Sequence, residues 1–351
     1  MNQALEGPSP GNRLGVVVIG RNEGMRLARC LASVRSVPVR VYVDSGSTDG
    51  SVELARGEGV TVVELPIPPH FTAARARNAG LTQLLAMKPE IEFVQMVDGD
   101  SELQPDWIEA ALAALRADPD LAVVFGRLRE RHPERSIFNK LCDEEWNVPI
   151  GEASGCGGNA MFRVSALREV KFYNPAVMAG EEFELALRLR RCGWRLRRID
   201  AEMALHDAAM TRLSQWWGRS RRSGHGYAQL ALLHPDATDP DWPRAVLSIV
   251  LWGGVIPATS IGALTITAAA AVGGSPHWWV ATAIIFLLWP VRMAQLTLRQ
   301  WQRGLSAKLA CASAGLLMLV KVPQLVGLIG YHRDRLAGRT SRLIEYKGTQ
   351  T

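Results

Sequence analysis

The stretch Phe93-Val94-Gln95-Met96-Val97-Asp98-Gly99-Asp100 joins a nearly uncharged, β-rich run to two carboxylates that flank one glycine. Such a run predicts a short strand that is buried on both faces of a parallel sheet. Ligands of open α/β sheets bind beyond the carboxyl ends of the strands, which is where Asp98 and Asp100 would lie. Two carboxylates are costly there unless a cation neutralises them, and a divalent ion bridging to a diphosphate is the natural partner. The alternative is an acidic turn without a ligand.

Strands and helices alternate along the first part of the chain. β-branched runs lie at Leu14–Ile19, Val39–Val43 and Val60–Leu65, and helical patterns at Met25–Val34 and Ser51–Gly57 separate them. This alternation predicts an α/β fold with a mostly parallel, doubly wound sheet. The first turn lacks the pattern G-x-G-x-x-G, which argues against a dinucleotide-binding dehydrogenase.

A polar turn follows the second of these strands. Asp44 ends the strand and Ser45–Gly50 offers hydroxyl and backbone N–H groups that suit a nucleotide base or a ribose. Asp44 is therefore a candidate ligand contact. The same turn could instead cap the following helix, through Asp49 or Ser51.

Polar islands further along the chain supply more candidates. The basic helix predicted within Phe71–Leu81 places Arg75 and Arg77 two residues apart, so at most one of them reaches a diphosphate. The loop Ser154–Asn159 contains three glycines, which allow a substrate to approach closely or simply form a tight turn. His206 is either a metal or phosphate ligand or a capped surface histidine.

Acidic residues crowd the start of a helix predicted from Gly180 to Cys192. The helix dipole alone favours acids there, and this accounts for Glu184 and Glu181. Glu182 is less well explained, because it is an acid beside another acid at a helix mouth. Like charge raises the pKa of a carboxyl group and suits it to the role of a general base.

The composition points to a membrane partner. The 351 residues include 40 Lys and Arg against 34 Asp and Glu, and the basic residues crowd into Arg188–Arg222, Arg292–Arg303 and Arg333–Arg342. Such crowding fits a surface facing anionic lipid, and no nucleic-acid-binding module is recognisable in the sequence. The five scattered cysteines form no C-x-x-C pair, which indicates a reducing compartment without a zinc site or a disulfide framework.

A long uncharged stretch predicts membrane spans. No Asp, Glu, Lys or Arg lies between Arg244 and Arg292, which is enough sequence for two helices of about 20 residues each. Leu309–Gly330 is a third candidate, interrupted by Lys321 and Pro323, and is either a full span or a re-entrant or interfacial segment. The positive-inside rule places the basic residues that follow the second span on the cytoplasmic side.

These observations divide the chain into segments. Length alone suggests roughly two domains, and the N-terminus has neither a basic n-region nor an apolar h-region, so no signal peptide is predicted. Aromatic and basic residues follow the last predicted strand, as in a helix lying in a membrane interface. We expect a disordered leader at 1–12, a catalytic domain at 13–212, an amphipathic interfacial segment and linker at 213–243, a transmembrane region of two to three helices at 244–330, and a basic tail at 331–351.

The order of the motifs resembles the family 2 glycosyltransferases of GT-A fold, of the membrane-anchored bacterial type. The resemblance covers roughly Arg13 to Arg222 and implies a GT-A catalytic domain followed by C-terminal transmembrane helices. It rests on the strand before Arg21-Asn22-Glu23, Asp44–Gly50, Arg77-Asn78, Asp98-Gly99-Asp100, Gly157-Gly158-Asn159 and Glu181-Glu182. The residues that would bind the nucleotide sugar are Ile19, Arg21, Glu23, Asp44, Ser45, Arg77, Asp98, Gly158 and Asn159.

The resemblance also implies a chemistry. Asp100 would ligate a divalent metal, Mn²⁺ or Mg²⁺, with Asp98 and His206 as further candidate ligands. Glu182 would be the catalytic base. Glu181 is the alternative, because the family usually has an aspartate at this position and the extra methylene of a glutamate could shift the role to the neighbouring residue. The family often has two adjacent acids where this chain has Asp44-Ser45.

The implied activity is an inverting, non-processive transfer of a hexose-type sugar. The donor would be a nucleotide sugar, with a UDP-sugar expected, and the acceptor a hydroxyl group of a lipid-linked or cell-envelope glycan, as in polysaccharide biosynthesis. Non-processive transfer is expected because the Gln-x-x-Arg-Trp signature of processive synthases is only echoed in Gln215-Trp216-Trp217-Gly218-Arg219. The location would be the inner membrane, with the catalytic domain on the cytoplasmic side.

Two interpretations from other classes remain open at this point. One is a membrane-tethered protein that binds sugar nucleotides without catalysis. The other is a nucleotidyltransferase, which also uses paired carboxylates at a sheet edge but releases pyrophosphate from a nucleoside triphosphate.

Overall fold

The computed structural model describes residues 13–66, 72–272 and 278–339. The leader predicted at 1–12 and residues 340–351 of the predicted tail lie outside these ranges. The chain divides into two compact units, of which the first ends at Arg212 and the second begins at Leu213. The five-segment division made from the sequence stays a prediction.

Four parallel strands form one half of the sheet in the first unit, in the order β3-β2-β1-β4. They are the β-branched runs predicted from the sequence, and the burial of β4 on both faces is confirmed. The strands are β1 (Leu14–Gly20), β2 (Val39–Asp44), β3 (Thr61–Glu64) and β4 (Phe93–Asp98). The helices between them are α1 (Met25–Ser33), α2 (Ser51–Gly57) and α3 (Ala73–Met87).

The other half of the sheet is mixed. β8 runs antiparallel to both β4 and β6, β6 and β9 are parallel, and the short strands β5 and β7 each run antiparallel to β9. The strands are β5 (Ser101–Leu103), β6 (Leu121–Glu130), β7 (Gly151–Glu152), β8 (Ala160–Arg163) and β9 (Arg195–His206). The helices of this half are α4 (Trp107–Ala117), α5 (Ile137–Glu145), α6 (Val164–Glu169) and α7 (Glu181–Arg191).

A buried polar pair lies in the middle of the core. Gln95 is fully buried in β4, and its Oε1 accepts a hydrogen bond of 2.8 Å from Nε1 of Trp107, the largest fully buried side chain. Because each polar group has the other as its partner, the pair avoids the cost of an unsatisfied buried group. It fixes the start of α4 against β4, the strand that leads into Asp98.

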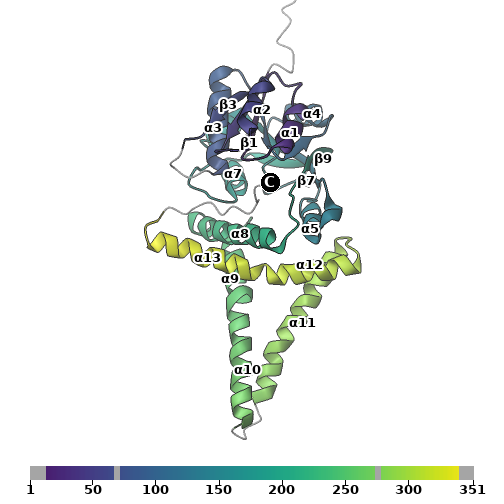
Figure 1. The fold of residues 1–351 in the computed structure, drawn as a ribbon, viewed down its shortest axis with the longest axis vertical. Coiled ribbons are helices and arrows are strands. Elements are labelled where there is room, and N and C mark those ends of the chain that lie inside the picture. Colours follow the sequence, from purple (N-terminus) through teal and green to yellow (C-terminus); the bar gives the residue numbers. More distant parts are fainter. Residues whose placement is uncertain (1–12, 67–71, 273–277, 340–351) are drawn as a thin grey trace, which may run out of the picture. The chain divides into compact units, whose positions relative to one another are not determined.

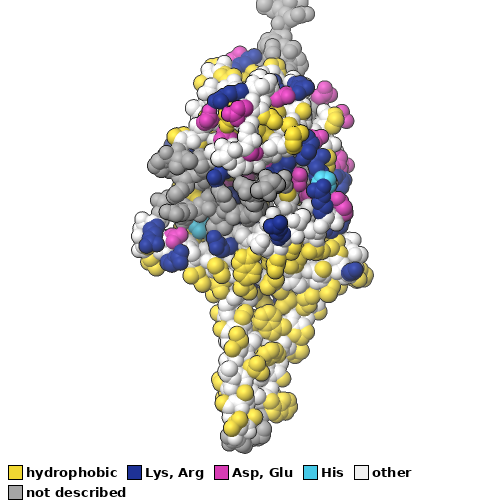
Figure 2. Space-filling model, in the orientation of Figure 1, with side chains coloured by type: hydrophobic (Ala, Val, Ile, Leu, Met, Phe, Trp, Pro, Cys, Tyr) yellow, Lys and Arg dark blue, Asp and Glu magenta, His cyan; other side chains and the backbone are white. Residues whose placement is uncertain are grey.

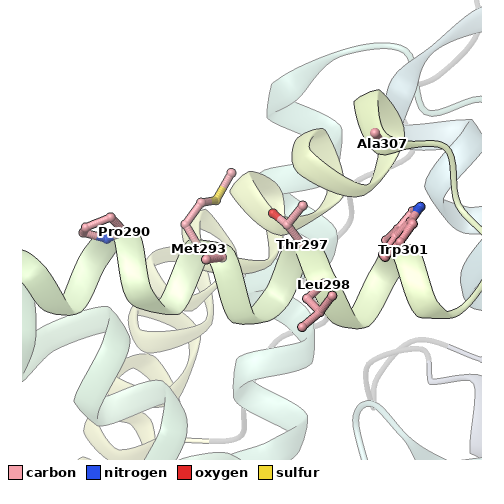
Figure 3. A pocket seen from close by; sticks show the side chains of 7 residues that line it. Pro290, Met293, Thr297, Leu298, Trp301 and Ala307 are labelled. Atoms are coloured by element: carbon pink, nitrogen blue, oxygen red, sulfur yellow. The ribbon is translucent and has the colours of Figure 1, made fainter.

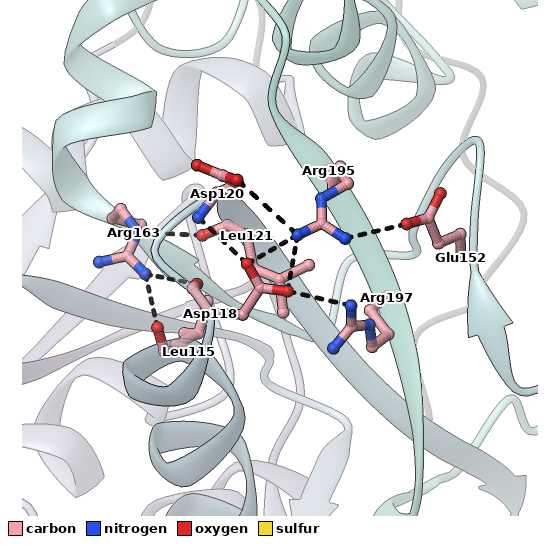
Figure 4. Close-up of polar contacts among 8 residues, drawn as sticks. All are labelled: Leu115, Asp118, Asp120, Leu121, Glu152, Arg163, Arg195 and Arg197. Carbon is pink, nitrogen blue, oxygen red and sulfur yellow. Dashed lines mark hydrogen bonds and ion pairs between the residues drawn. The ribbon is translucent and has the colours of Figure 1, made fainter.

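A cluster of ion pairs aligns the start of β6 with the start of β9 (Figure 4). Asp118 accepts hydrogen bonds of 2.8 Å from Arg195 and 3.0 Å from Arg197. Arg163 donates to the backbone carbonyls of Leu115 and Leu121. Since β6 and β9 run parallel, their register places His206 at the opposite end of β9, beside the candidate site.

The second unit consists of helices. Three of its stretches are long and apolar enough to cross a membrane: Trp242–Val272, Trp278–Gln302 and Ala307–Leu336. Figure 2 shows hydrophobic side chains over the visible face of α10 and α11. The elements are α8 (Leu213–Leu233), α9 (Trp242–Val250), the π-helical turn η3 (Leu251–Val255), α10 (Ile256–Val272), α11 (Trp278–Gln302), α12 (Ala307–Leu319) and α13 (Lys321–Leu336).

Helices α8 and α13 lie side by side in close contact (Figure 1). A Cβ atom added at Gly224 of α8 would collide with the backbone of Gln324 in α13. One added at Gly327 of α13 would collide with the backbone of Arg221 in α8. The two glycines therefore allow the backbones to approach more closely than any larger residue would.

Candidate active site

The carboxyl ends of three neighbouring strands meet at one edge of the sheet. Gly20 of β1 is level with Asp44 of β2, and Ile19 is level with Asp98 of β4. The backbone N–H of Ser45 donates to the carbonyl of Gly20 at 3.0 Å, and that of Gly99 donates to the carbonyl of Ile19 at 2.8 Å. The predicted residues that follow these strands are therefore neighbours in space, as expected for parallel strand ends.

Asp98, Asp100 and His206 form a group of candidate metal ligands. One ligand atom from each lies within 4.8 Å of the others, and His206 Nε2 is 3.4 Å from Asp100 Oδ1. Two carboxylates and an imidazole are ligands that suit Mn²⁺, and the carboxylates also suit Mg²⁺. The residues present thus fit a divalent ion.

The position of His206 corrects one expectation. The sequence run Trp194–Ile199 predicts a last strand that ends at Ile199, but β9 continues to His206 and pairs antiparallel with β5, where His206 lies opposite Ser101. This pairing brings His206 next to the end of the Asp98-Gly99-Asp100 turn. The ring of Trp146 packs edge-on against the imidazole, with ring centroids 4.7 Å apart.

Arg77 joins the candidate metal group to the candidate base. One of its terminal nitrogens, Nη1, donates to Glu181 at 2.8 Å and to Glu182 at 2.9 Å, while Nη2 donates to Asp98 at 2.9 Å. The side chain is only 2 % exposed, and the Tyr173 ring lies 5.5 Å from the guanidinium carbon. The predicted diphosphate contact stays untested, but three carboxylates already surround this guanidinium.

The loop before β8 supports this arrangement. Asn159 accepts a hydrogen bond of 3.0 Å from the backbone N–H of Asp98 and donates to Ser101 Oγ at 3.1 Å, so it bridges the two ends of the acidic turn. A Cβ atom at Gly158 would collide with Arg77 Nη2 and Asp98 Oδ2. Both residues therefore pack directly on the turn, whatever further contact they make with a donor.

Glu182 and Glu181 differ in their environments. Burial raises the pKa of Glu182 to about 7, with a further increase from the neighbouring charge of Glu181, while Arg77 opposes the shift. The raised pKa agrees in direction with the sequence argument, although burial contributes more than like charge. The Glu182 side chain is 15 % exposed and that of Glu181 only 4 %, so Glu182 is better placed to meet a substrate.

Asp44 is turned into its own loop. The carboxylate is 2 % exposed; Oδ2 accepts 2.8 Å hydrogen bonds from the N–H groups of Gly46 and Ser47, and Oδ1 accepts one from the Tyr42 hydroxyl. Asp44 thus shapes the turn that was predicted to face the nucleotide. The N-cap of helix α2 is Gly50 rather than Asp49 or Ser51, although Asp49 Oδ1 accepts a hydrogen bond of 3.1 Å from the N–H of Ser51, the first residue of the helix.

The remaining predicted donor residues lie in the turn after β1. Arg21 is exposed there, and Glu23 Oε2 is 2.9 Å from a guanidinium nitrogen of Arg26. Asn22, with a positive φ of 55°, accepts a hydrogen bond from the N–H of Thr48 and so links this turn to the one after β2. The N–H of Asn22 donates in turn to Ser47 Oγ at 2.9 Å, so the two turns are joined by hydrogen bonds in both directions.

Sequence reasoning missed four residues whose side chains contact the predicted site residues. These side chains are far apart in the chain, and nothing in their local pattern connects them. Only Tyr42 carried a signal, since it lies two residues before Asp44 in the same strand and so points to the same face. The missed residues are Tyr42, Ser101, Trp146 and Tyr173.

Comparison with known sequences adds to this geometry. The sequence model of "Glycosyl transferase family 2" matches residues 15–171, in agreement with the resemblance seen in the motifs. The pre-mycofactocin glycosyltransferase of Mycobacterium tuberculosis is 27% identical over 254 residues, which are 69% of this chain and 51% of that protein. The succinoglycan biosynthesis protein ExoA of Rhizobium meliloti is 25% identical over 238 residues, 62% of this chain and 71% of that protein. The chain thus spans about half the length of the mycobacterial relative.

Comparison with solved structures concerns the fold. The mannosyltransferase PcManGT of Pyrobaculum calidifontis, solved with GDP-Man and Mn²⁺, has a TM-score of 0.59 and 20% sequence identity, covering 92% of this chain and 88% of that chain. The GT-A-like fold with C-terminal candidate membrane helices, expected from the sequence, is confirmed.

Proposed function

We propose, from the premise that residues 15–171 form a domain of glycosyl transferase family 2, that the protein moves a sugar from a nucleotide-sugar donor to an acceptor hydroxyl group. The observation that carries this proposal is the position of Asp98. Its carboxylate belongs to the metal-ligand group with Asp100 and His206, and it is also bonded to Arg77, which holds Glu181 and Glu182. Asp98 therefore connects the residues that would bind the donor with the glutamates that would act on the acceptor.

Asp98, Asp100 and His206 are the residues that would hold the divalent ion. Such an ion, when bound, stabilises the negative charge that grows on the diphosphate as the sugar–phosphate bond breaks. Without it the two carboxylates would repel a diphosphate. The acidic turn is thus suited to a donor only together with a cation.

Glu182 is the proposed base. With a pKa of about 7, its carboxylate is able to accept the proton of an acceptor hydroxyl group near neutral pH. The acceptor oxygen then bonds to the anomeric carbon as the bond from that carbon to the diphosphate oxygen breaks, and the nucleoside diphosphate leaves. One displacement of this kind inverts the anomeric configuration.

The acceptor and the location belong to the same proposal. Three apolar stretches are long enough to cross a membrane, which supports a lipid-linked or envelope glycan as acceptor. The proposed location, the cytoplasmic side of the inner membrane, rests on the positive-inside rule applied to the basic residues after the second span. The nucleotide base is open between uridine and guanosine: a UDP-sugar was the expectation from the sequence, whereas the similar mannosyltransferase carries GDP-Man.

A donor screen tests the proposal. Purified full-length protein in detergent is given UDP-, GDP- and dTDP-sugars with a membrane lipid extract, in Mn²⁺, Mg²⁺ or chelator, and released nucleoside diphosphate is measured. We expect metal-dependent release from one donor and a sugar-labelled product that partitions into organic solvent. NMR of the product gives its anomeric configuration.

Two variants serve as controls. Asp100→Ala removes a candidate ligand and should abolish release, whereas Asp120→Ala removes an exposed carboxylate from the same unit and should not. Metal-dependent donor binding without release would favour a binding protein without catalysis. Pyrophosphate release from a nucleoside triphosphate would favour a nucleotidyltransferase.

A further inference from the structure

The second unit contains a cavity of about 130 Å³ among its apolar helices. One water molecule occupies about 30 Å³ of liquid volume, so the cavity has room for a group the size of a phosphate. Its walls come from η3, α11, α12 and the first residue of α13. The lining residues are Trp252, Trp289, Arg292, Leu296, Leu317, Met318 and Lys321.

Two of these residues are cations and none is an acid. The sequence contains no Asp or Glu between Asp241 and Asp334, so η3, α11 and α12 bring no carboxylate to the cavity, and α13 lines it only with Lys321. Ionisable residues within membrane segments are costly and usually mark a site. Among the residues that the structure describes, no carboxylate forms an ion pair with Arg292 or Lys321, so these two cations suit an anion.

The aromatic residues hold the arginine in place. The Arg292 guanidinium carbon lies 5.2 Å from the centroid of the Trp252 ring, a cation–π contact. The Trp252 and Trp289 rings are 6.3 Å apart and nearly perpendicular, and Trp289 Nε1 donates to Ser260 Oγ at 3.0 Å. The cation is thus positioned by packing and still has N–H groups for a ligand.

An apolar groove of about 520 Å³ runs along the adjoining face of α11. Figure 3 shows Met293, Thr297 and Trp301 of α11 on the side where Ala307 of α12 lies. The lining side chains are almost all apolar, with Pro290, Ala294 and Leu298 completing the set. Such a groove accommodates a hydrocarbon chain beside the cationic cavity.

The depth of the cavity matches a lipid headgroup. About 20 residues separate Trp252 from the end of α10 at Val272, which corresponds to roughly 30 Å of helix, the thickness of a hydrocarbon core. A helix pair that crosses the bilayer would therefore place Trp252 and Arg292 near one interface. Tryptophan and arginine are typical of that level.

We propose that this cavity and groove bind an anionic membrane phospholipid. Its phosphate lies between Arg292 and Lys321, and one acyl chain lies along the groove on α11. Basic pockets between membrane helices bind anionic headgroups in the same manner. The proposal does not depend on sugar transfer, because every residue in it belongs to the second unit.

Native mass spectrometry of the delipidated full-length protein tests this. Phosphatidylglycerol and phosphatidylcholine of the same chain length are titrated separately, and the first bound lipid is counted. Two cations, each contributing about as much as a basic residue near an anionic surface, predict roughly thirtyfold tighter binding of phosphatidylglycerol. The double variant Arg292→Gln/Lys321→Gln should lose this preference.

Matched variants make the result specific. Arg299→Gln/Lys308→Gln removes two exposed cations of the same region and should keep the preference, as should the charge-conserving Arg292→Lys/Lys321→Arg. Equal binding of the two lipids, or loss of the preference in the exposed-cation variant, would overturn the proposal. Displacement of the lipid by millimolar inorganic phosphate would also overturn it, because the acyl chain would then contribute nothing.

Discussion

The sheet edge of the first unit and the cavity of the second unit differ in how the charge of their cations is balanced. At the sheet edge, one arginine is enclosed by Asp98, Glu181 and Glu182. In the cavity, Arg292 and Lys321 share one space without an acid among the lining residues. Charge is compensated from within the chain in the first case and only by a ligand in the second.

The charge balance of each region indicates whether it needs a ligand and which charge that ligand carries. The network around Arg77 still has more carboxylates than cations once Asp100 is added, so it suits a divalent ion together with an anionic donor. The cavity has only positive charge, so it suits an anion alone. The following substitutions test this difference between the two regions, in order of decreasing expected effect.

Arg77→Met should have the largest effect, because it leaves three carboxylates without their shared cation. Removing one partner of a buried ion pair costs about 3–5 kcal/mol, so we expect a clear fall in the thermal unfolding temperature. Arg292→Met, which removes an uncompensated cation, should leave the unfolding temperature of lipid-free protein unchanged or raise it. Equal losses in the two variants would show that the two regions do not differ.

Glu182→Gln should lower the turnover number by about 10²- to 10⁴-fold, the usual contribution of a general base. Donor binding, measured by calorimetry with Mn²⁺, should be retained, because the amide keeps the shape of the carboxyl group. Glu53→Gln changes an exposed acid of the first turn of α2 and serves as the control. Full turnover in Glu182→Gln would transfer the role to Glu181.

The pH dependence of catalysis tests the coupling between the two glutamates. Since the base must be ionised, kcat/KM should rise with pH up to about 7, the pKa of Glu182. In Glu181→Gln the neighbouring negative charge is lost, so this rise should move to lower pH. In Arg77→Met it should move to higher pH. An unchanged profile in both variants would separate the titrating group from the network.

The same pKa shift affects stability with a definite sign. Glu182 holds its proton more tightly in the folded protein than at its ordinary pKa of 4.5. Its contribution to the free energy of unfolding is therefore fully present below about pH 4.5 and is lost as the pH rises through about 7.

Tyr42→Phe should have the smallest effect. It removes the hydroxyl donor to Asp44, whose other oxygen keeps its two backbone partners, and a single hydrogen bond of this kind contributes about 1 kcal/mol to the free energy of unfolding. Denaturation measures this loss, and the KM for the donor should stay the same. Weakened donor binding at unchanged stability would instead make Asp44 a direct nucleotide contact.

Much of the site could be predicted because parallel strands bring their ends to one edge. The strand runs before Gly20, Asp44 and Asp98 could be recognised locally, and their proximity followed from the sheet. The connection from Arg77 to Glu181 could not be predicted, since it joins residues 104 positions apart. The inward turn of Asp44 depends equally on a backbone conformation that no residue pattern specifies.

The candidate membrane segments show the same limit. Composition alone identified the apolar stretches, and Lys321 appeared there only as a defect in the third candidate. The packing of η3 and α11 against the first residue of α13 turns that defect into one wall of a cationic cavity. The role of a charged residue in an apolar helix thus depends on which residues the packing places beside it, and the sequence of that helix does not show them.

The glycine contacts between α8 and α13 also have a consequence for biosynthesis. The two helices that press together at Gly224 and Gly327 are made about 100 residues apart, which is roughly 5–20 s of translation. During that interval α8 has emerged from the ribosome while the surface that covers it does not yet exist. Assembly of the second unit therefore has to wait until α13 is made, and in a protein truncated before α13 the helix α8 would lack the surface that it packs against.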